Sequence, residues 1–274
     1  METINRKAKI REAAKRLNPI DDLLFRKMTE SLPFCQEILR VFLRDKDLVV
    51  KEAAAQYAMS NLQGRSVVAD ARCLLSDGTS VLIEVQKAND DDHQRRVRYN
   101  SSVLTANITD PGTKFKSVPD ICSVFLSQFN LFGTVQALNH VQRTLSKQGQ
   151  AVCNGWQEVY VSAGVDDGSE TAQLMKIFTE DDAYDDDVFP ETSGLKRQFK
   201  ETEEGQQIMC EAMREIMEEV AREERAEGMK AGRIEGKMEA LASLVRQGII
   251  TASEGARQAG MGEDIFAVHL SQNN

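Results

Sequence analysis

The sequence predicts an α/β protein with an acidic, helical C-terminal extension. Residues 67–72 and 81–86 are strand-like runs on either side of a turn that ends in Gly78, a pattern typical of a β-hairpin. A helix is expected from about residue 92 to 109, and a further strand-like run surrounds Cys122. With 274 residues, 41% of them hydrophobic, the chain can bury one sizeable core and carry an appendage.

The register of the hairpin decides which side chains share a face. If Leu75 pairs with Thr79 around a three-residue loop, Asp70 stands directly opposite Glu84, with Cβ atoms about 5 Å apart. Strand alternation adds Gln86 to the same face. Two carboxylates presented together are typical of a divalent metal site, because hard cations prefer oxygen ligands.

The opposite face of the hairpin is expected to be apolar core. A two-residue turn at Asp77-Gly78 is the alternative. It offsets the strands by one, places Asp70 opposite Val85, and makes the acids ordinary surface residues. In the three-residue register, the apolar face consists of Ala69, Ala71, Cys73, Val81, Ile83 and Val85.

Several segments in order carry a family resemblance. A helix-like opening at residues 18–27 precedes Asp70 and Glu84-Val85-Gln86, and segments 92–100 and 118–133 follow. This ordered set resembles the PD-(D/E)XK nuclease family transposases, also called recombination-promoting nucleases. The resemblance implies a restriction-endonuclease-like core of order α-β-β-β-α-β and a Mg²⁺-dependent DNA endonuclease associated with recombination or mobile elements. Fold-level analogy alone is an associational argument for function.

The resemblance also assigns roles by position. It implies that Asp70 and Glu84 are catalytic, metal-binding carboxylates, with the Val85 backbone carbonyl as a further ligand. Mg²⁺, for which Mn²⁺ can substitute, keeps several waters, so a site with few carboxylates is normal. Gln86 stands where the wider superfamily has lysine, and a neutral amide can only hydrogen-bond to water or phosphate. Lys87 follows, but strand alternation points it to the other face.

Other acidic residues have two interpretations each. Asp22 matches the acidic position of the family's first helix and is a candidate outer metal ligand; alternatively, it is a helix N-terminal acid favoured by the macrodipole. The run Asp90, Asp91 and Asp92 fits helix capping better than a second metal site. His93 is expected to be a surface or cap residue.

The helix that follows the hairpin is the candidate DNA-binding element. Arginine pairs bidentately with phosphate oxygens, although a solvated helix face is the competing interpretation. Residues 1–164 hold 22 Lys and Arg against 18 Asp and Glu, whereas residues 165–274 hold 12 against 25. This asymmetry permits DNA binding without demanding it. The DNA-backbone candidates are Arg95, Arg96, Arg98 and Tyr99.

The chain is expected to divide into three regions. Residues 1–178 form the nuclease-like domain, residues 179–239 an acidic linker and a long charged helical segment, and residues 240–274 a small helical module. Three glycines spaced by four cost the charged helix about 1 kcal/mol each relative to alanine. This part is therefore expected to be a weak helix or a connector, unless a partner helix packs there. The glycines are Gly228, Gly232 and Gly236.

The C-terminal module is expected to hold two short helices, the second capped by Thr251 or Ser253. A DNA-reading helix-turn-helix is one interpretation. That helix contains only Arg257 as a contact to a base or phosphate, so a helical packing or dimerisation unit is favoured, and a homodimer through these helices is the candidate assembly.

The five scattered cysteines resemble reduced core thiols, and no signal peptide or membrane span is evident. We therefore expect a cytoplasmic protein. The functional alternative to a DNA endonuclease is a nuclease-derived regulatory protein that binds DNA or protein without cutting.

Overall fold

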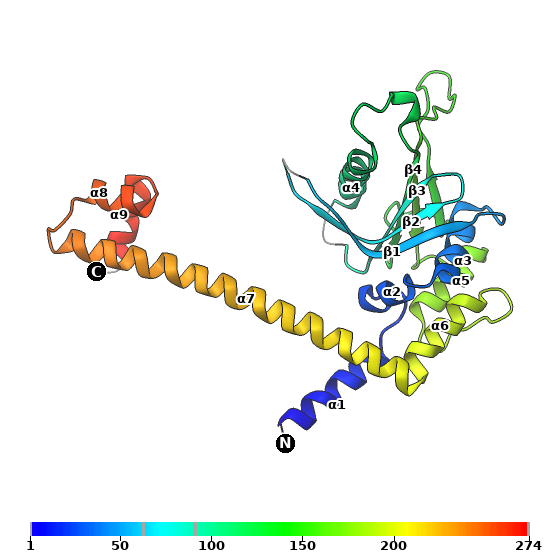
Figure 1. Cartoon of the computed structure of the whole chain (residues 1–274), viewed down its shortest axis with the longest axis horizontal. Helices are drawn as coiled ribbons and strands as arrows, with labels where there is room; N and C mark the ends of the chain where they lie inside the picture. Colours follow the sequence, from blue (N-terminus) through cyan, green and yellow to red (C-terminus); the bar gives the residue numbers. More distant parts are fainter. Residues whose placement is uncertain (1, 62–63, 90–91, 273–274) are drawn as a thin grey trace. The chain divides into compact units, whose positions relative to one another are not determined.

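The computed structural model describes residues 2–61, 64–89 and 92–272. Within these residues the chain forms a mixed six-stranded sheet of order β1-β2-β3-β4-β6-β5 (Figure 1). Strands β1, β2 and β3 pair antiparallel, β3, β4 and β6 pair parallel, and β5 joins β6 antiparallel. The predicted α/β class is therefore confirmed. The strands are β1 (Val50–Met59), β2 (Val67–Leu75), β3 (Ser80–Gln86), β4 (Ile121–Ser127), β5 (Leu138–Val141) and β6 (Trp156–Ser162).

Helices cover both faces of the sheet. Helices α2 and α3 contact β1, and α3 also contacts α5 and β6, so these helices lie on one face. Helix α4 contacts β1, β2 and β4 from the other face. The helices are α1 (Glu2–Lys15), α2 (Asp22–Met28), α3 (Leu32–Leu43), α4 (His93–Ile108), the short 3-10 helix η1 (Phe115–Ser117), α5 (Glu170–Thr179), α6 (Pro190–Glu201), α7 (Glu203–Arg246), α8 (Ala252–Ala259) and α9 (Glu263–Gln272).

Side-chain caps explain where the helices beside the sheet begin. Ser31 accepts a hydrogen bond from the Phe34 amide at the start of α3, and Asp92 accepts one from the Arg95 amide at the start of α4. The helix predicted at about 92–109 and the capping role of Asp92 are confirmed. Asp90 and Asp91 lie outside the described residues.

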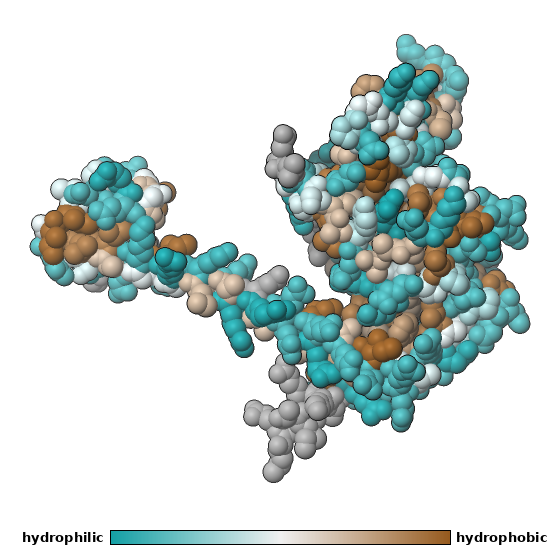
Figure 2. All heavy atoms as spheres, viewed as in Figure 1, coloured by the Kyte–Doolittle hydropathy of each residue, from teal (hydrophilic) through white to brown (hydrophobic). Residues whose placement is uncertain are grey.

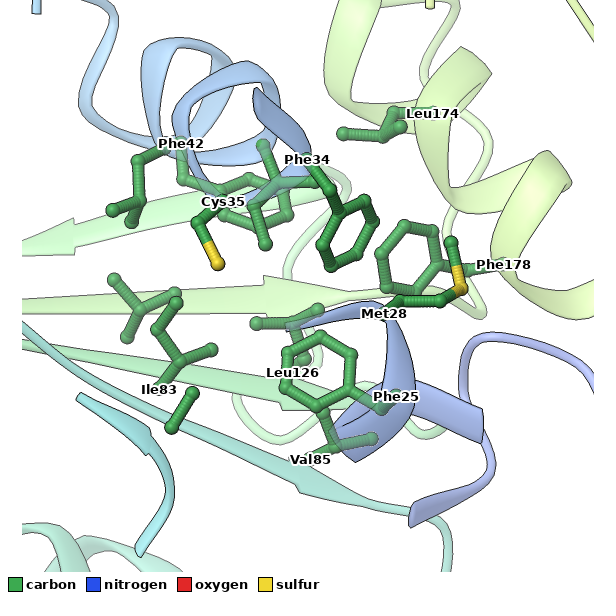
Figure 3. Close-up of a cluster of buried hydrophobic side chains, with 14 of the residues drawn as sticks. Phe25, Met28, Phe34, Cys35, Phe42, Ile83, Val85, Leu126, Leu174 and Phe178 are labelled. Carbon is green, nitrogen blue, oxygen red and sulfur yellow. The ribbon is translucent and has the colours of Figure 1, made fainter. Parts of the chain in front are cut away.

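Aromatic side chains hold the helices on the α2 face of the sheet. Phe25 of α2, Phe34 of α3 and Phe178 of α5 meet with ring centroids 6.1 to 6.3 Å apart. Figure 3 shows these rings around Leu126 of β4, with Val85 of β3 next to Phe25. All five side chains are buried. This layer fixes α2, which carries Asp22, against the centre of the sheet.

The cysteines divide into two groups. Cys35, Cys73 and Cys122 are buried free thiols, as the sequence predicts. Cys153 is exposed and Cys210 is half-buried, so the expectation of a core position is wrong for Cys153, which lies in the loop between β5 and β6.

The chain divides into two compact units, residues 1–213 and 214–274, whereas the sequence predicts boundaries after residues 178 and 239. In the first unit, α6 packs against α2 and α3, so chain beyond residue 178 contributes to the same body. Helix α7 runs without a break from Glu203 to Arg246, through all three glycines that the sequence predicts to weaken it.

The second unit contains a small core of its own. Met238, Leu241, Ala256 and Phe266 form a buried cluster that joins α7, α8 and α9. Thr251 accepts a hydrogen bond from the Glu254 amide at the start of α8, which decides between the two predicted caps. Residues 240–246 complete α7, and α8 and α9 are the short helices that follow. Apolar side chains also reach the surface of this unit (Figure 2).

None of the helices in the described ranges combines the length and the apolar character needed to cross a bilayer.

Candidate metal centre and nucleic-acid surface

The hairpin has the register that brings the two acidic positions together. The Leu75 amide donates to the Thr79 carbonyl oxygen at 2.9 Å, and Gly78 closes the loop with a φ of 95°. Ala71 pairs with Ile83 as the last pair of the ladder, and this register, continued by one position, aligns Asp70 with Glu84. The three-residue loop is therefore confirmed, and the two-residue alternative is excluded.

Strands β2 and β3 part at this position. Their pairing ends at Ala71 and Ile83, yet β2 continues to Val67 against β1 and β3 continues to Gln86 against β4. The carboxylate of Asp70 bridges the start of the gap, since Oδ2 accepts a hydrogen bond from the Val85 amide at 2.8 Å. We call this region, from Asp70 to Gln86 across the two strands, the fork.

The strand alternation breaks at Asp70, and the predicted face of Ala69 is wrong. Ala71 belongs to the main core cluster, but Ala69 packs with Leu82 in the cluster under α4. Opposite Asp70, Gln56 of β1 has a φ of 50°, a left-handed conformation that is uncommon outside glycine. The β1–β2 register is the same on both sides of this position, since Ala55 pairs with Ala71 and Tyr57 with Ala69, so the irregularity is a local change of backbone conformation without an inserted residue.

Glu84 is held from the α4 face. Asn100 donates from Nδ2 to Glu84 Oε1, and Arg96 Nε lies 2.9 Å from Glu84 Oε2 as an ion pair. Oε2 has no aligned hydrogen bond despite this contact. Arg96 also donates from Nη1 to Gln86 Oε1 at 2.9 Å. Arg96 therefore touches both Glu84 and Gln86, while Asn100 orients the Glu84 carboxylate.

Asp70 is held from the α2 face, so the partners of Asp70 and Glu84 come from opposite faces of the sheet, unlike the shared face that the sequence predicts. The pKa of the Asp70 carboxyl is also raised. Arg26 bridges the acids of the two elements: its Nε lies 2.6 Å from Asp22 Oδ1 and its Nη2 lies 3.8 Å from Asp70 Oδ1. Burial, followed by the negative charges of Asp22 and Glu84, raises the pKa of Asp70 to about 7, against the opposing effects of the Val85 amide and Arg26. The three carboxylates therefore interact electrostatically at one place. Asp22 remains half-exposed in the first turn of α2, so the helix-terminal interpretation also fits it.

The residues at the fork fit a hard divalent cation with few protein ligands. Within the described part of the chain, no cluster of three or more His, Cys, Asp or Glu side chains is close enough together to bind a metal ion. The oxygen atoms that could coordinate a metal ion here belong to the Asp70 and Glu84 carboxylates and the Val85 carbonyl. Glu84 Oε2 is buried without an aligned hydrogen bond, and the pKa of the neighbouring Asp70 carboxyl is raised. A cation would stabilise the negative charge of both groups. This donor set suits Mg²⁺, which retains water ligands.

Lys87 does not share the fork with Gln86. Its Nζ lies 2.6 Å from Asp21 Oδ1, in the turn before α2, which confirms the predicted orientation toward the other face.

A groove lies beside the fork on the α4 side. It has a volume of about 730 Å³ and is lined by residues 64–68 of β2 and its preceding loop, and by Asp92, Arg95, Arg96, Tyr99 and Asn100. Three of the four predicted DNA-backbone residues thus line one groove, whereas Arg98 is exposed but is not part of its lining.

The contacts of these side chains differ. Arg95 pairs with Asp92, the N-cap residue of its own helix, at 3.1 Å. The Tyr99 hydroxyl donates to the Arg65 carbonyl and accepts from Asn61, so Tyr99 also ties α4 to the loop before β2.

Two features of α4 were not evident from the sequence. His93 is buried between Phe125 and Phe129, with ring centroids 5.3 and 5.1 Å away, so the expectation of a surface residue is wrong. Asn100, which the sequence interpretation left without a role, binds Glu84. The signal was the spacing of four between Arg96 and Asn100, which places both on one helix face.

Comparisons with protein-family models, with curated proteins and with solved structures find no match for this chain.

Proposed function

We propose that this protein is a Mg²⁺-dependent DNA endonuclease of the PD-(D/E)XK type, similar to the recombination-promoting nucleases. The observation that carries the proposal is the fork, where Asp70 and Glu84 are both buried at the point where β2 and β3 part and the charge of Glu84 helps to raise the pKa of Asp70. Burial of two acids at a point where two strands part is costly unless a cation or a proton compensates the charge.

The order of elements supports the same proposal. Helices α2 and α3 are followed by β1, β2, β3, α4 and β4, which corresponds to the order α-β-β-β-α-β that the family resemblance implies. The candidate acids come from the second and third strands of this order.

The proposed roles follow from the contacts. Asp70, Glu84 and the Val85 carbonyl would hold Mg²⁺, or Mn²⁺ in its place, with Asp22 as an outer carboxylate. The metal would supply polarisation of the scissile phosphate and a lowered pKa of the attacking water. Gln86 would orient that water or a phosphate oxygen through its amide.

The groove beside α4 is the proposed path of the DNA backbone. Arg95 and Arg96 line it, and exposed Arg98 and the Tyr99 hydroxyl stand on the same helix. Helix α4 contains three arginines and no acidic residue, so its surface suits phosphate contacts. We place this activity in cytoplasmic DNA recombination, with a homodimer through the C-terminal helices as the proposed assembly.

One observation favours the second candidate, a regulatory protein that binds without cutting. Both oxygens of Glu84 already have protein partners, Asn100 and Arg96. A carboxylate whose two oxygens keep these protein partners would not bind a metal ion. The binding surface would then lie on the second unit, where the apolar side chains of Ile249, Ile265 and Val268 are more than half exposed.

Cleavage of supercoiled plasmid tests the proposal. Purified protein is incubated with Mg²⁺ or with EDTA, and nicked and linear products are scored for the wild type, Glu84→Ala and Glu52→Ala. Glu52 is an exposed glutamate on β1, so its variant is the matched control. Cutting that requires metal and is lost only in Glu84→Ala is the expected result. A fully active Glu84→Ala protein, or a folded wild type that cuts under no metal condition, contradicts the proposal.

A further inference from the structure

Arg96 is the cation that faces Glu84 in this structure. Its Nε lies 2.9 Å from Glu84 Oε2, and its Nη1 donates to Gln86 Oε1 at 2.9 Å. The Glu84 side chain is only 5% exposed, whereas the Arg96 side chain is 36% exposed. The acid is therefore fixed in the fork, and the guanidinium approaches it from the edge that opens to the groove.

The two partners of Glu84 differ in kind. Asn100 is buried and hydrogen-bonds to Oε1, which fixes the orientation of the carboxylate. Arg96 contacts Oε2 as an ion pair without an aligned hydrogen bond. An unaligned charge contact at the solvent edge is easier to exchange than an aligned, buried hydrogen bond.

The groove offers Arg96 a second location. Arg96 lines the groove together with Arg95 and Tyr99. A long arginine side chain can therefore leave the fork without unfolding any element, because only its own rotamers change. In the groove, the planar guanidinium can contact a phosphate bidentately.

We propose that Arg96 is an exchangeable positioning residue: it neutralises Glu84 while no divalent cation is bound, gives up that carboxylate when the cation binds, and then contacts a DNA phosphate. This inference rests on the proposed function, since it assumes that Glu84 is a metal ligand. It makes DNA contact by Arg96 conditional on metal.

The direction in which Arg96→Ala changes the metal affinity distinguishes an exchangeable Arg96 from one that only supports the site. A guanidinium and a divalent cation compete for the same buried oxygen, and removal of the guanidinium leaves the carboxylate charge uncompensated. Arg96→Ala is therefore expected to bind the metal more tightly. If Arg96 merely supported the site, its loss would weaken metal binding, as losses around metal ligands ordinarily do.

The first test titrates Mn²⁺ into the full-length protein at pH 8 and measures binding by calorimetry. Arg96→Ala is expected to bind about tenfold more tightly than the wild type. Arg95→Ala, which removes the neighbouring arginine that pairs only within the helix in the described contacts, is the matched control and is expected to be unchanged. Unchanged or weaker binding by Arg96→Ala overturns the inference.

The Glu84→Gln variant distinguishes a failure of the inference about Arg96 from a failure of the proposed function. If the wild type binds Mn²⁺ and Glu84→Gln does not, the metal assignment stands and Arg96→Ala alone decides the inference. If no variant shows Mn²⁺ binding that depends on Glu84, both the proposed function and the inference fail.

The second test measures binding of a duplex oligonucleotide over a range of salt concentrations, with EDTA and with Ca²⁺ as a probe cation. With Ca²⁺, Arg96→Ala is expected to lower the slope of log K against log salt by about 0.9, the value of one phosphate contact. With EDTA, the wild type and Arg96→Ala are expected to have the same slope. An equal loss in both conditions would show that Arg96 contacts DNA without metal, which overturns the exchange.

Discussion

Asp70→Asn is expected to stabilise the first unit at neutral and alkaline pH while it removes a metal ligand. The carboxylate of Asp70 is buried, and burial together with the charges of Asp22 and Glu84 raises its pKa from 3.8 to about 7. An asparagine amide oxygen can still accept the hydrogen bond from the Val85 amide. The substitution therefore removes the unfavourable charge and keeps the bridge between β2 and β3.

The sign and the size of the effect follow from proton linkage. Because the pKa of Asp70 is higher in the folded state, the folded protein binds the proton more tightly than the unfolded chain. This contribution to stability is complete below about pH 4 and is lost as the pH rises to about 7. A shift of about three pH units, at about 1.4 kcal/mol each, corresponds to a loss of about 4 kcal/mol at most.

The variant should therefore exceed the wild type in free energy of unfolding by about 2–4 kcal/mol at pH 8, but by only about 1 kcal/mol at pH 5. Urea unfolding followed by tryptophan fluorescence measures this difference. Trp156 is the only tryptophan of the chain and lies in β6, so the signal reports on the first unit. Asp110→Asn, at an exposed loop position, is the control and should show no such pH dependence. An Asp70→Asn protein that is equally stable to the wild type at pH 8, or less stable, would refute the reasoning.

Four further predictions concern the protonation of Asp70 and substitutions at Lys196, Gly255 and Gly228. Mn²⁺ affinity of the wild type is expected to fall about tenfold from pH 8 to pH 6, because Asp70 must lose its proton to bind metal; calorimetric titration at both values tests this, and equal affinities contradict it. Lys196 is buried and donates to the carbonyls of Ile177, Glu180 and Ala183, so Lys196→Met should lower the free energy of unfolding by about 3–5 kcal/mol in the same urea assay; a loss below 1 kcal/mol would contradict this. Gly255→Ala should reduce the thermal stability of the second unit by about 1–3 kcal/mol, because an added Cβ would lie 2.8 Å from the Phe266 ring. Gly228→Ala, with nothing within 4 Å, should stabilise α7 by up to about 1 kcal/mol; circular dichroism melting compares the two variants, and equal effects would contradict the packing argument.

The hairpin register could be predicted because local rules determine it. The loop that ends in Gly78 needs a positive φ, and the observed value is 95°. Alternation of apolar and polar residues then leaves little freedom, since a slip by one residue would turn every side chain to the other face. Asp70 and Glu84 could be placed opposite one another from about twenty residues of sequence for this reason.

The features that could not be predicted depend on contacts between distant segments. The break in alternation at Asp70 involves Gln56 on the neighbouring strand, where the left-handed backbone occurs without a glycine to indicate it. His93 looks polar in the sequence, but it is buried because the first turn of α4 lies against Phe125 and Phe129. The contact of Arg96 with Glu84 likewise depends on how α4 lies across the sheet. Local pattern determines which residues share an element's face, and tertiary packing determines what that face meets.

The electrostatics of the fork favour a functional site over a purely structural one. If Asp70 served only to bridge the strands, a neutral acceptor for the Val85 amide would be sufficient and would avoid the cost of a buried charge. Three carboxylates, Asp22, Asp70 and Glu84, interact here, and two arginines, Arg26 and Arg96, pair with them from opposite faces. With all three carboxylates ionised, one negative charge would remain unpaired, and the burial of Asp70 opposes that state by raising the pKa of Asp70 to about 7. Perturbed acids of this kind are concentrated at functional sites, and a divalent cation is the ligand that would relieve the excess. The raised pKa of Asp70 beside Asp22 and Glu84 is thus the property that favours the proposed metal site over a purely structural bridge between the strands.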